Sequence, residues 1–199
     1  LLDVHVPALR VSEVVSQLRT LQVSWTELHS DVGALIEAQM LENDRIQTST
    51  RAGFFDSYAN PLQLNAYLYS LASQYPTMAQ LEEIGTSIEG RNITAVHVCS
   101  KDDCSDLPAV VFNGCQHARE WLSPMTVTYV LSGLLTNYTT NSEVKDVVDG
   151  FDWWFIPVVN ADGYAFSWDS QRLWRKNRRE NPDSACVGVD LNRNWGYAW

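Results

Sequence analysis

Basic residues are scarce in this sequence. Its 14 Lys and Arg stand against 24 Asp and Glu, which gives a formal net charge of −10 at pH 7. Such an acidic balance argues against a general nucleic-acid binder. A run of about 20 apolar residues, the length of a membrane-spanning helix, is also lacking. The longest apolar run, residues 153–159, is only as long as a strand. We therefore expect neither nucleic-acid nor membrane partners.

Cysteine is sparse too, and no C-x-x-C pair of the kind found in structural zinc sites occurs. Cys99 and Cys104 are spaced to close a small loop, whereas four reduced thiols in a cytosolic protein are the alternative. Two N-x-T triplets, at Asn92 and Asn137, weakly favour a secreted glycoprotein. No basic segment followed by an apolar one opens the chain, so we expect any signal peptide to lie outside it. The cysteines are Cys99, Cys104, Cys115 and Cys186.

The first 43 residues are patterned as a small α/β unit. Alternating apolar residues predict strands over 2–6 and 23–28, and helical spacing predicts helices over 11–21 and 32–40. About forty residues make only a small hydrophobic core, so we expect this unit to pack against a neighbouring domain or to be incomplete. The polar stretch 42–54 then predicts a linker or an ordinary polar loop, and an exposed linker is a favoured protease site.

From residue 56 onward the pattern is that of an α/β domain. Asn60 and Pro61 predict a helix start, and further helices are expected after Ser123 and over 144–148. The continuous apolar run 153–159 predicts a strand that is buried on both faces. The other predicted strands are 81–84, 94–98 and 109–112.

His117 and Glu120 form an H-x-x-E pair between a predicted strand and a predicted helix. An imidazole and a carboxylate three residues apart can meet one metal ion when the segment turns, and zinc accepts both kinds of ligand. Ligands collect at the carboxyl ends of strands in open α/β sheets. The pair alone is a weak signal, and the alternative is a surface His and Glu at a helix start.

Two later segments concentrate polar side chains. Residues 172–179 hold five basic residues around Trp174, which suits a stacking platform for nucleic acid, an anion site for carboxylates, or a solvated loop. Residues 186–195 predict a short strand that ends in polar groups. There the adjacent Asn192 and Arg193 can bind one carboxylate together.

Five stretches, in this order, closely resemble the M14 family of zinc carboxypeptidases, in its carboxypeptidase A/B branch. They are residues 84–91, 117–121, 160–163, 173–176 and 187–195. Residues 3–7, 23–26 and 31–35 resemble the pro-segment of that branch. The resemblance covers nearly the whole chain. It implies an α/β fold with a mixed sheet flanked by helices, incomplete at its C-terminal strands, preceded by part of a small α/β pro-domain.

The resemblance implies a domain plan and a set of partners. Residues 1–44 would be a partial pro-segment, 45–55 a linker with cleavage sites after Arg45 or Arg51, and 56–199 the N-terminal part of the catalytic domain. The implied partners are a peptide or protein with a free C-terminal carboxylate, the pro-segment as an inhibitor, and an activating protease. The implied location is extracellular.

The same resemblance implies the site residues. His117 and Glu120 would be the first two ligands of Zn²⁺, and Arg175 would polarise the scissile carbonyl and stabilise the oxyanion. Asn192 and Arg193 would hold the terminal carboxylate of the substrate. Arg119 would line the site, and Arg172 would be an auxiliary carboxylate contact.

Two family features have no counterpart in the sequence, namely a third zinc ligand and a late glutamate that activates water. His5, His29 and His97 all precede the H-x-x-E pair and do not match. The resemblance also pairs Cys186 with a cysteine further downstream. We therefore expect a truncated metallocarboxypeptidase precursor that is inactive by itself. The alternative is a non-catalytic protein that binds C-terminal carboxylates.

Overall fold

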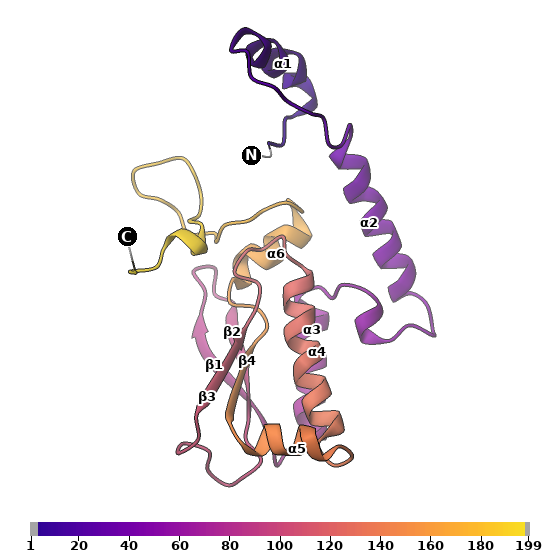
Figure 1. Cartoon of the computed structure of the whole chain (residues 1–199), viewed down its shortest axis with the longest axis vertical. Coiled ribbons are helices and arrows are strands. Elements are labelled where there is room, and N and C mark those ends of the chain that lie inside the picture. The colour runs from indigo at the N-terminus through magenta and orange to yellow at the C-terminus, as the bar shows by residue number, and fades with distance from the viewer. Residues whose placement is uncertain (1–3, 198–199) are drawn as a thin grey trace. The chain divides into compact units, whose positions relative to one another are not determined.

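The structure is a computed structural model that describes residues 4–197. The chain divides into two compact units, Leu1–Glu42 and Asn43–Trp199. Figure 1 labels the elements of both units along the chain.

Within its described residues, 4–42, the first unit contains the two predicted helices but neither predicted strand. Helix α1 covers Val11–Thr20, after the 3₁₀ turn η1 at Ala8–Arg10, and α2 begins at Val32. Residues 23–28 are irregular, and residues 4–6 are irregular as well, whereas residues 1–3 lie outside the described part. Both strand predictions are wrong within the described residues. The alternating pattern has no partner strand there, and a lone strand cannot satisfy its backbone groups.

Helix α2 runs over Val32–Gln47, well into the stretch that the sequence predicts as a linker. The buried Asn43 explains the extension. Its amide donates to the Tyr58 carbonyl at 3.1 Å, and its Oδ1 accepts from the Tyr58 N–H at 2.7 Å. The last turn of α2, from Asn43 onward, is part of the second unit and is held there by these bonds. Only residues 48–53 separate α2 from the 3₁₀ turn η2 at Phe54–Asp56.

A four-stranded mixed sheet forms the centre of the second unit. The strands are β1 (Ala79–Thr86), β2 (Asn92–Val98), β3 (Ala109–Asn113) and β4 (Asp152–Ile156), in the order β1-β2-β4-β3. Strands β3 and β4 run parallel, whereas β1 with β2 and β2 with β4 are antiparallel. This arrangement confirms the predicted α/β class and its mixed sheet.

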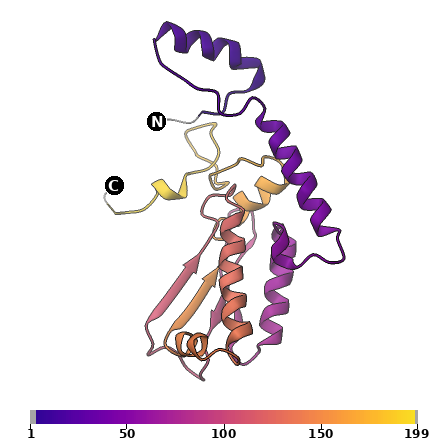
Figure 2. The ribbon, with the colours of Figure 1, turned by 45° about the vertical axis from the view of Figure 1, so that its right-hand side comes forward.

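Helices α3 (Pro61–Gln74) and α4 (Leu122–Asn137) lie on one side of the sheet in both views (Figures 1 and 2). Asn60 caps α3 as predicted, by a reciprocal pair of hydrogen bonds with Gln63. The Tyr67 hydroxyl of α3 meets the Ser132 hydroxyl of α4 at 3.0 Å. The core between helices and sheet consists mainly of Leu68, Leu71, Val96, Val98, Leu131, Leu135, Trp153 and Phe155.

Strand β4 departs from its predicted burial. Only the alternate residues Trp153 and Phe155 are fully buried, and the strand ends at Ile156, before Pro157. The described residues cover one face of the sheet more completely than the other. The prediction of burial on both faces is therefore wrong here.

Two short helices and a 3₁₀ turn complete the unit. Helix α5 (Ser142–Asp149) is capped by Asn141, α6 (Ala161–Asp169) by Asn160, and η3 (Leu191–Arg193) by Asp190. The predicted strand within residues 186–195 is wrong. Gly188 has φ +81°, and a side chain there would lie 2.1 Å from the Asn177 carbonyl, so extended backbone is interrupted.

Candidate functional site

The loop between β3 and α4 places His117 at the carboxyl end of the sheet. Gly114 follows β3 in close contact with neighbouring backbone: an added Cβ would lie 2.8 Å from the Pro157 carbonyl. Cys115 follows with φ +53°, and its N–H donates to the Ser123 hydroxyl at 3.0 Å. The chain therefore turns sharply just before His117, at the sheet edge where ligands collect in α/β folds.

His117 lies between two carboxylates. Its Nδ1 is 2.9 Å from Glu120 Oε1, and its Nε2 is 3.1 Å from Asp190 Oδ1. The residue His117 is 8% exposed, whereas the side chain of Glu120 is 48% exposed. A buried imidazole with a carboxylate at each nitrogen has a fixed orientation, and the carboxylate at its Nδ1 is the more exposed of the two.

Arg175 completes a charged cluster with these residues. Its Nε donates to Asp190 Oδ2 at 2.9 Å, and its guanidinium lies 3.7 Å from Glu120 Oε1. The Ala118 N–H donates to the Arg175 carbonyl at 3.1 Å, so the two loops are also joined through their backbones. The cluster brings together groups that are up to 73 residues apart in the sequence.

Asp190 is ionised near neutral pH. Partial burial acts to raise its pKa, but hydrogen bonds from Arg175 and from the Asn192 N–H lower the pKa to about 2. A hydrogen bond from His117 acts in the same direction. One carboxylate therefore orients both the imidazole and the guanidinium.

The basic segment 172–179 packs largely on aromatic rings. The Arg172 guanidinium lies 3.7 Å from the Trp121 ring, and that of Arg178 lies 3.7 Å from the Phe166 ring. Arg172 also donates to the Arg119 carbonyl at 2.8 Å. Its partial burial lowers the pKa of Arg172. Neither guanidinium belongs to a simple solvated loop, and Arg172 links the segment to the loop that bears His117.

Asn192 and Arg193 lie on η3, two and three residues after Asp190. Both are exposed, and the Asn192 backbone N–H donates to Asp190 Oδ1 at 2.9 Å. Arg193 donates to the Asn192 carbonyl at 2.7 Å. Asp190 thus connects the predicted carboxylate-binding pair to the predicted metal-binding pair.

Two residues of the site have no role in the sequence-based account, Asp190 and Asn160. Asp190 is visible there only as one polar group among several at the end of segment 186–195. Asn160 belongs to one of the five family-like stretches, yet its side chain bridges segments whose proximity the sequence does not reveal. Both contacts depend on tertiary structure, so residue spacing could not have disclosed them.

A zinc site is only partly represented by these side chains. Within residues 4–197, no group of three or more His, Cys, Asp and Glu side chains could hold a metal ion. His117 Nδ1 and Glu120 Oε1 are nevertheless donors of the kinds that zinc binds. The Asp190 carboxylate at Nε2 is the kind of group that usually accepts from the other ring nitrogen of a metal-binding His. The donor set therefore fits two protein ligands of a zinc site.

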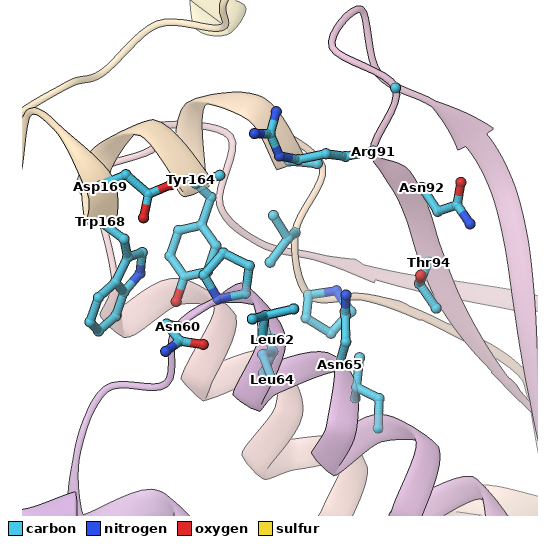
Figure 3. Close-up of a pocket in the computed structure, with 17 residues that line it drawn as sticks. Asn60, Leu62, Leu64, Asn65, Arg91, Asn92, Thr94, Tyr164, Trp168 and Asp169 are labelled. Carbon is cyan, nitrogen blue, oxygen red and sulfur yellow. The ribbon is translucent and has the colours of Figure 1, made fainter.

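A cavity of about 620 Å³ lies elsewhere in the second unit. Figure 3 shows it between Asn60 and Leu64 of the α3 start, Arg91 and Thr94 near the β1–β2 turn, and Tyr164 of α6. None of the predicted site residues lines it. Its lining carries no cluster of metal-binding or nucleophilic groups, so the charged cluster around His117 remains the candidate site.

The helices of the described residues include none that is long and apolar enough to cross a membrane. The small loop expected between Cys99 and Cys104 is closed by a disulfide.

Comparison with known proteins identifies the family. A family model of zinc carboxypeptidases, peptidase family M14, matches residues 64–199. Metallocarboxypeptidase A of Trichophyton rubrum is 35% identical over 203 residues, which cover 99% of this chain and 46% of that protein. The inactive metallocarboxypeptidase ECM14 of Uncinocarpus reesii is 38% identical over 160 residues, covering 78% of this chain and 27% of that protein.

A solved structure of a carboxypeptidase is similar to this chain as well. The crystal structure of carboxypeptidase A from Helicoverpa armigera matches with a TM-score of 0.84 and 29% identity. The match covers 97% of this chain and 49% of that one. The chain spans about half the length, or less, of these relatives. Because the family match covers well over half of the sequence, the chain belongs to the M14 family of zinc carboxypeptidases.

Proposed function

We propose that the complete protein is a zinc-dependent metallocarboxypeptidase that releases C-terminal amino acids from peptides and proteins. The observation that carries the proposal is the cluster of His117, Glu120, Arg175 and Asp190 at the carboxyl end of the sheet. It unites a pair of metal donors with a cation suited to an oxyanion. Membership of the zinc carboxypeptidase family supports the same reaction.

His117 Nδ1 and the Glu120 carboxylate are the proposed zinc ligands. Asp190 would accept from His117 Nε2–H, which would leave Nδ1 unprotonated and able to bind zinc. Zinc, when bound, activates a water molecule for attack on a peptide carbonyl. Arg175 polarises that carbonyl and stabilises the negative oxygen that develops on it.

Capture of the substrate's terminal carboxylate explains the removal of single residues. Asn192 and Arg193 on η3 are the proposed binding pair, because an arginine fork and an adjacent amide match a carboxylate. Arg119 and Arg172 are the proposed accessory contacts, and they are joined by a hydrogen bond of 2.8 Å. An amidated C-terminus would lose these charge-assisted bonds.

A third zinc ligand and a general-base glutamate are proposed to come from further sequence of the complete protein. Catalytic zinc has three protein ligands, and the described residues offer two. The relatives are about twice as long as this chain. The 199 residues alone are therefore expected to bind zinc poorly and to be inactive.

The domain plan is likewise a proposal. Residues 1–44 act as a partial inhibitory pro-segment, 45–55 as the linker that an activating protease cuts, and 56–199 as the first part of the catalytic domain. The Cys99–Cys104 disulfide supports an extracellular location, because disulfides persist in oxidising compartments.

The test is mass spectrometry of peptides incubated with the complete protein, before and after limited trypsin treatment, with and without a chelator. We expect loss of one C-terminal residue after trypsin, abolished by the chelator and by Glu120→Ala. The matched control is Glu143→Ala, an exposed glutamate on α5, which should retain activity. Intact peptides under all conditions would refute the peptidase proposal.

The second candidate function is binding of C-terminal carboxylates without catalysis. The similarity to an inactive metallocarboxypeptidase keeps this alternative open. It predicts peptide binding that depends on Arg193, survives a chelator, and never shortens the peptide. The retained pairing of His117, Glu120 and Arg175 favours the enzyme, because binding alone has no chemical need for all three.

A further inference from the structure

Both the nitrogen and the oxygen of the Asn160 carboxamide form hydrogen bonds inside the protein. The residue is 3% exposed. Its Nδ2 donates to the Gln116 carbonyl at 3.0 Å and to the Lys176 carbonyl at 3.1 Å. Its Oδ1 accepts from the Gly163 N–H at 3.1 Å and so caps α6. One buried side chain therefore joins three segments of the unit.

Two of these segments carry the proposed chemistry. Gln116 immediately precedes the zinc-ligand candidate His117, and Lys176 immediately follows Arg175. The Asn160 backbone N–H also donates to the Cys115 carbonyl at 3.2 Å, so both backbone and side chain hold the loop. The direct bond between the two segments, from Ala118 N–H to Arg175 carbonyl, is 3.1 Å long. Asn160 adds a buried side-chain bridge to this bond and to the contacts that Arg172 and Arg175 make with the loop.

Only a carboxamide meets the geometry of this position. A helix cap requires an acceptor, which Asp, Ser or Thr would also supply. The two carbonyls, however, require two N–H donors, and Asp in its ionised form has none. Gly163 leaves the necessary space, because a Cβ there would lie 2.5 Å from Asn160 Oδ1 and 2.6 Å from the Lys176 carbonyl.

We propose that Asn160 is a positioning residue that sets the distance between the zinc-ligand loop and Arg175. This inference rests on the proposed function, since it assigns a purpose to the spacing of His117 and Arg175. Asn160 touches neither of these side chains and acts through the backbone of their neighbours. Its loss should misplace the oxyanion-stabilising cation relative to the metal, while leaving η3 and its carboxylate-binding pair largely unaffected.

Asn160→Asp is the decisive variant. It keeps the Oδ1 cap of α6 but places a second oxygen opposite two carbonyl oxygens. The matched control is Asn141→Asp, because Asn141 caps α5 through its Oδ1, which accepts from Glu143 N–H at 2.9 Å. Both substitutions preserve a helix cap, but only Asn160→Asp removes the hydrogen bonds to the Gln116 and Lys176 carbonyls. If the buried carboxylate of Asn160→Asp prevents folding, Asn160→Ala replaces it in the same measurements.

In the complete, trypsin-activated protein, Asn160→Asp should lower kcat about 10- to 100-fold, as a small displacement of catalytic groups does. KM should change far less than kcat, because the terminal carboxylate is bound by η3. The affinity for zinc, measured by competition with a chelator, should fall in parallel. Hydrogen exchange of peptides covering residues 115–121 and 172–177 should accelerate selectively. Asn141→Asp should match the unsubstituted protein in all four measurements.

Unchanged exchange in both peptides, or equal effects of Asn160→Asp and Asn141→Asp, would overturn the proposal and leave Asn160 as a cap only. A parallel change of kcat and KM that follows general loss of folded protein would overturn it as well. Exchange and zinc affinity require no catalysis. If the complete protein proves inactive on peptides, these two readouts still decide the positioning role separately from the proposed function.

Discussion

Asp190 connects three parts of the candidate site. It contacts His117 Nε2, Arg175 Nε and the Asn192 N–H through two carboxylate oxygens. A single acidic residue therefore orients a proposed metal ligand, a proposed oxyanion stabiliser and the turn with the proposed carboxylate-binding pair. The sequence alone places this residue two positions before Asn192 but gives no sign of its contact with His117.

Asp190→Asn should lower the affinity of the complete protein for zinc about 10- to 100-fold, because the imidazole loses the carboxylate that fixes its tautomer. Asp183→Asn, at an exposed position of the preceding loop, is the control. Competition with a chromogenic chelator measures the affinity. Equal zinc affinity in the two variants would show that Asp190 does not support the metal ligand.

Arg175→Ala should lower kcat about 10²- to 10³-fold with a smaller effect on KM, because oxyanion stabilisation acts in the transition state. Arg179→Ala, an exposed position in the same basic segment, should leave kcat unchanged. Steady-state kinetics on a peptide with a free C-terminus gives both constants. A rise in KM with unchanged kcat would assign Arg175 to ground-state binding instead.

The H-x-x-E pair and its chemistry follow from local sequence, since a short turn alone brings His117 to Glu120. Their meeting with Arg175 could be inferred only through the family resemblance. The bridging role of Asn160 could not be predicted from residue types, because it depends on how closely α6 approaches two loops. Long-range backbone contacts of this kind leave no periodic pattern.

At the level of elements, the two candidate cleavage sites differ in structure. Arg45 lies in the last turn of α2, whereas Arg51 is exposed in the turn that follows. Proteases cut exposed irregular segments in preference to helices.

Limited trypsin treatment should therefore cut after Arg51 first. N-terminal sequencing of the large product identifies the site, and Arg51→Gln should slow the cleavage much more than Arg45→Gln. First cleavage after Arg45 would mean that the end of α2 unfolds readily in solution.

Helix α5 is joined to the disulfide loop by Asp149. Hydrogen bonds from Lys145 and from the Ser100 hydroxyl lower the pKa of Asp149 to about 2, below the usual value of about 3.9. A depressed folded-state pKa means that the ionised carboxylate contributes stability above about pH 4. That contribution is lost as the pH falls from about 4 toward 2.

Asp149→Asn should remove this part of the pH dependence. Thermal unfolding followed by circular dichroism should show a smaller drop in melting temperature between pH 4 and pH 2.5 than in the unsubstituted chain. Asp146→Asn, an exposed carboxylate on the same helix, is the control and should behave like the unsubstituted chain. Identical profiles for all three proteins would contradict a contribution from Asp149.

At the scale of the whole molecule, the sequence predicts elements well where local signals suffice. The Asn60–Pro61 start of α3 is an example, because the cap and the first-turn proline act within one turn. From residue 4 onward, neither strand expected before residue 29 is present, because a strand needs a partner, which alternating residues do not guarantee. The strand expected within 186–195 fails at Gly188, whose backbone packs against Asn177.

One edge of the sheet is unpaired among the described residues. Strand β3 pairs only with β4, so its other edge has no partner within residues 4–197. Val111 and Phe112 on this strand are 55% and 39% exposed. Exposed apolar edges favour association between chains. The loop with His117 follows directly from this strand, so the site and the open edge are close in the fold.

The central claim is that this chain contributes metal-binding and carboxylate-binding residues to one carboxypeptidase site. The most direct measurement is mass spectrometry of two peptides that differ only in a free or an amidated C-terminus, each incubated with the trypsin-activated complete protein. The account predicts that the free peptide loses single C-terminal residues in a chelator-sensitive reaction and that the amidated peptide stays intact. Equal shortening of both peptides, or no shortening of either, would contradict it.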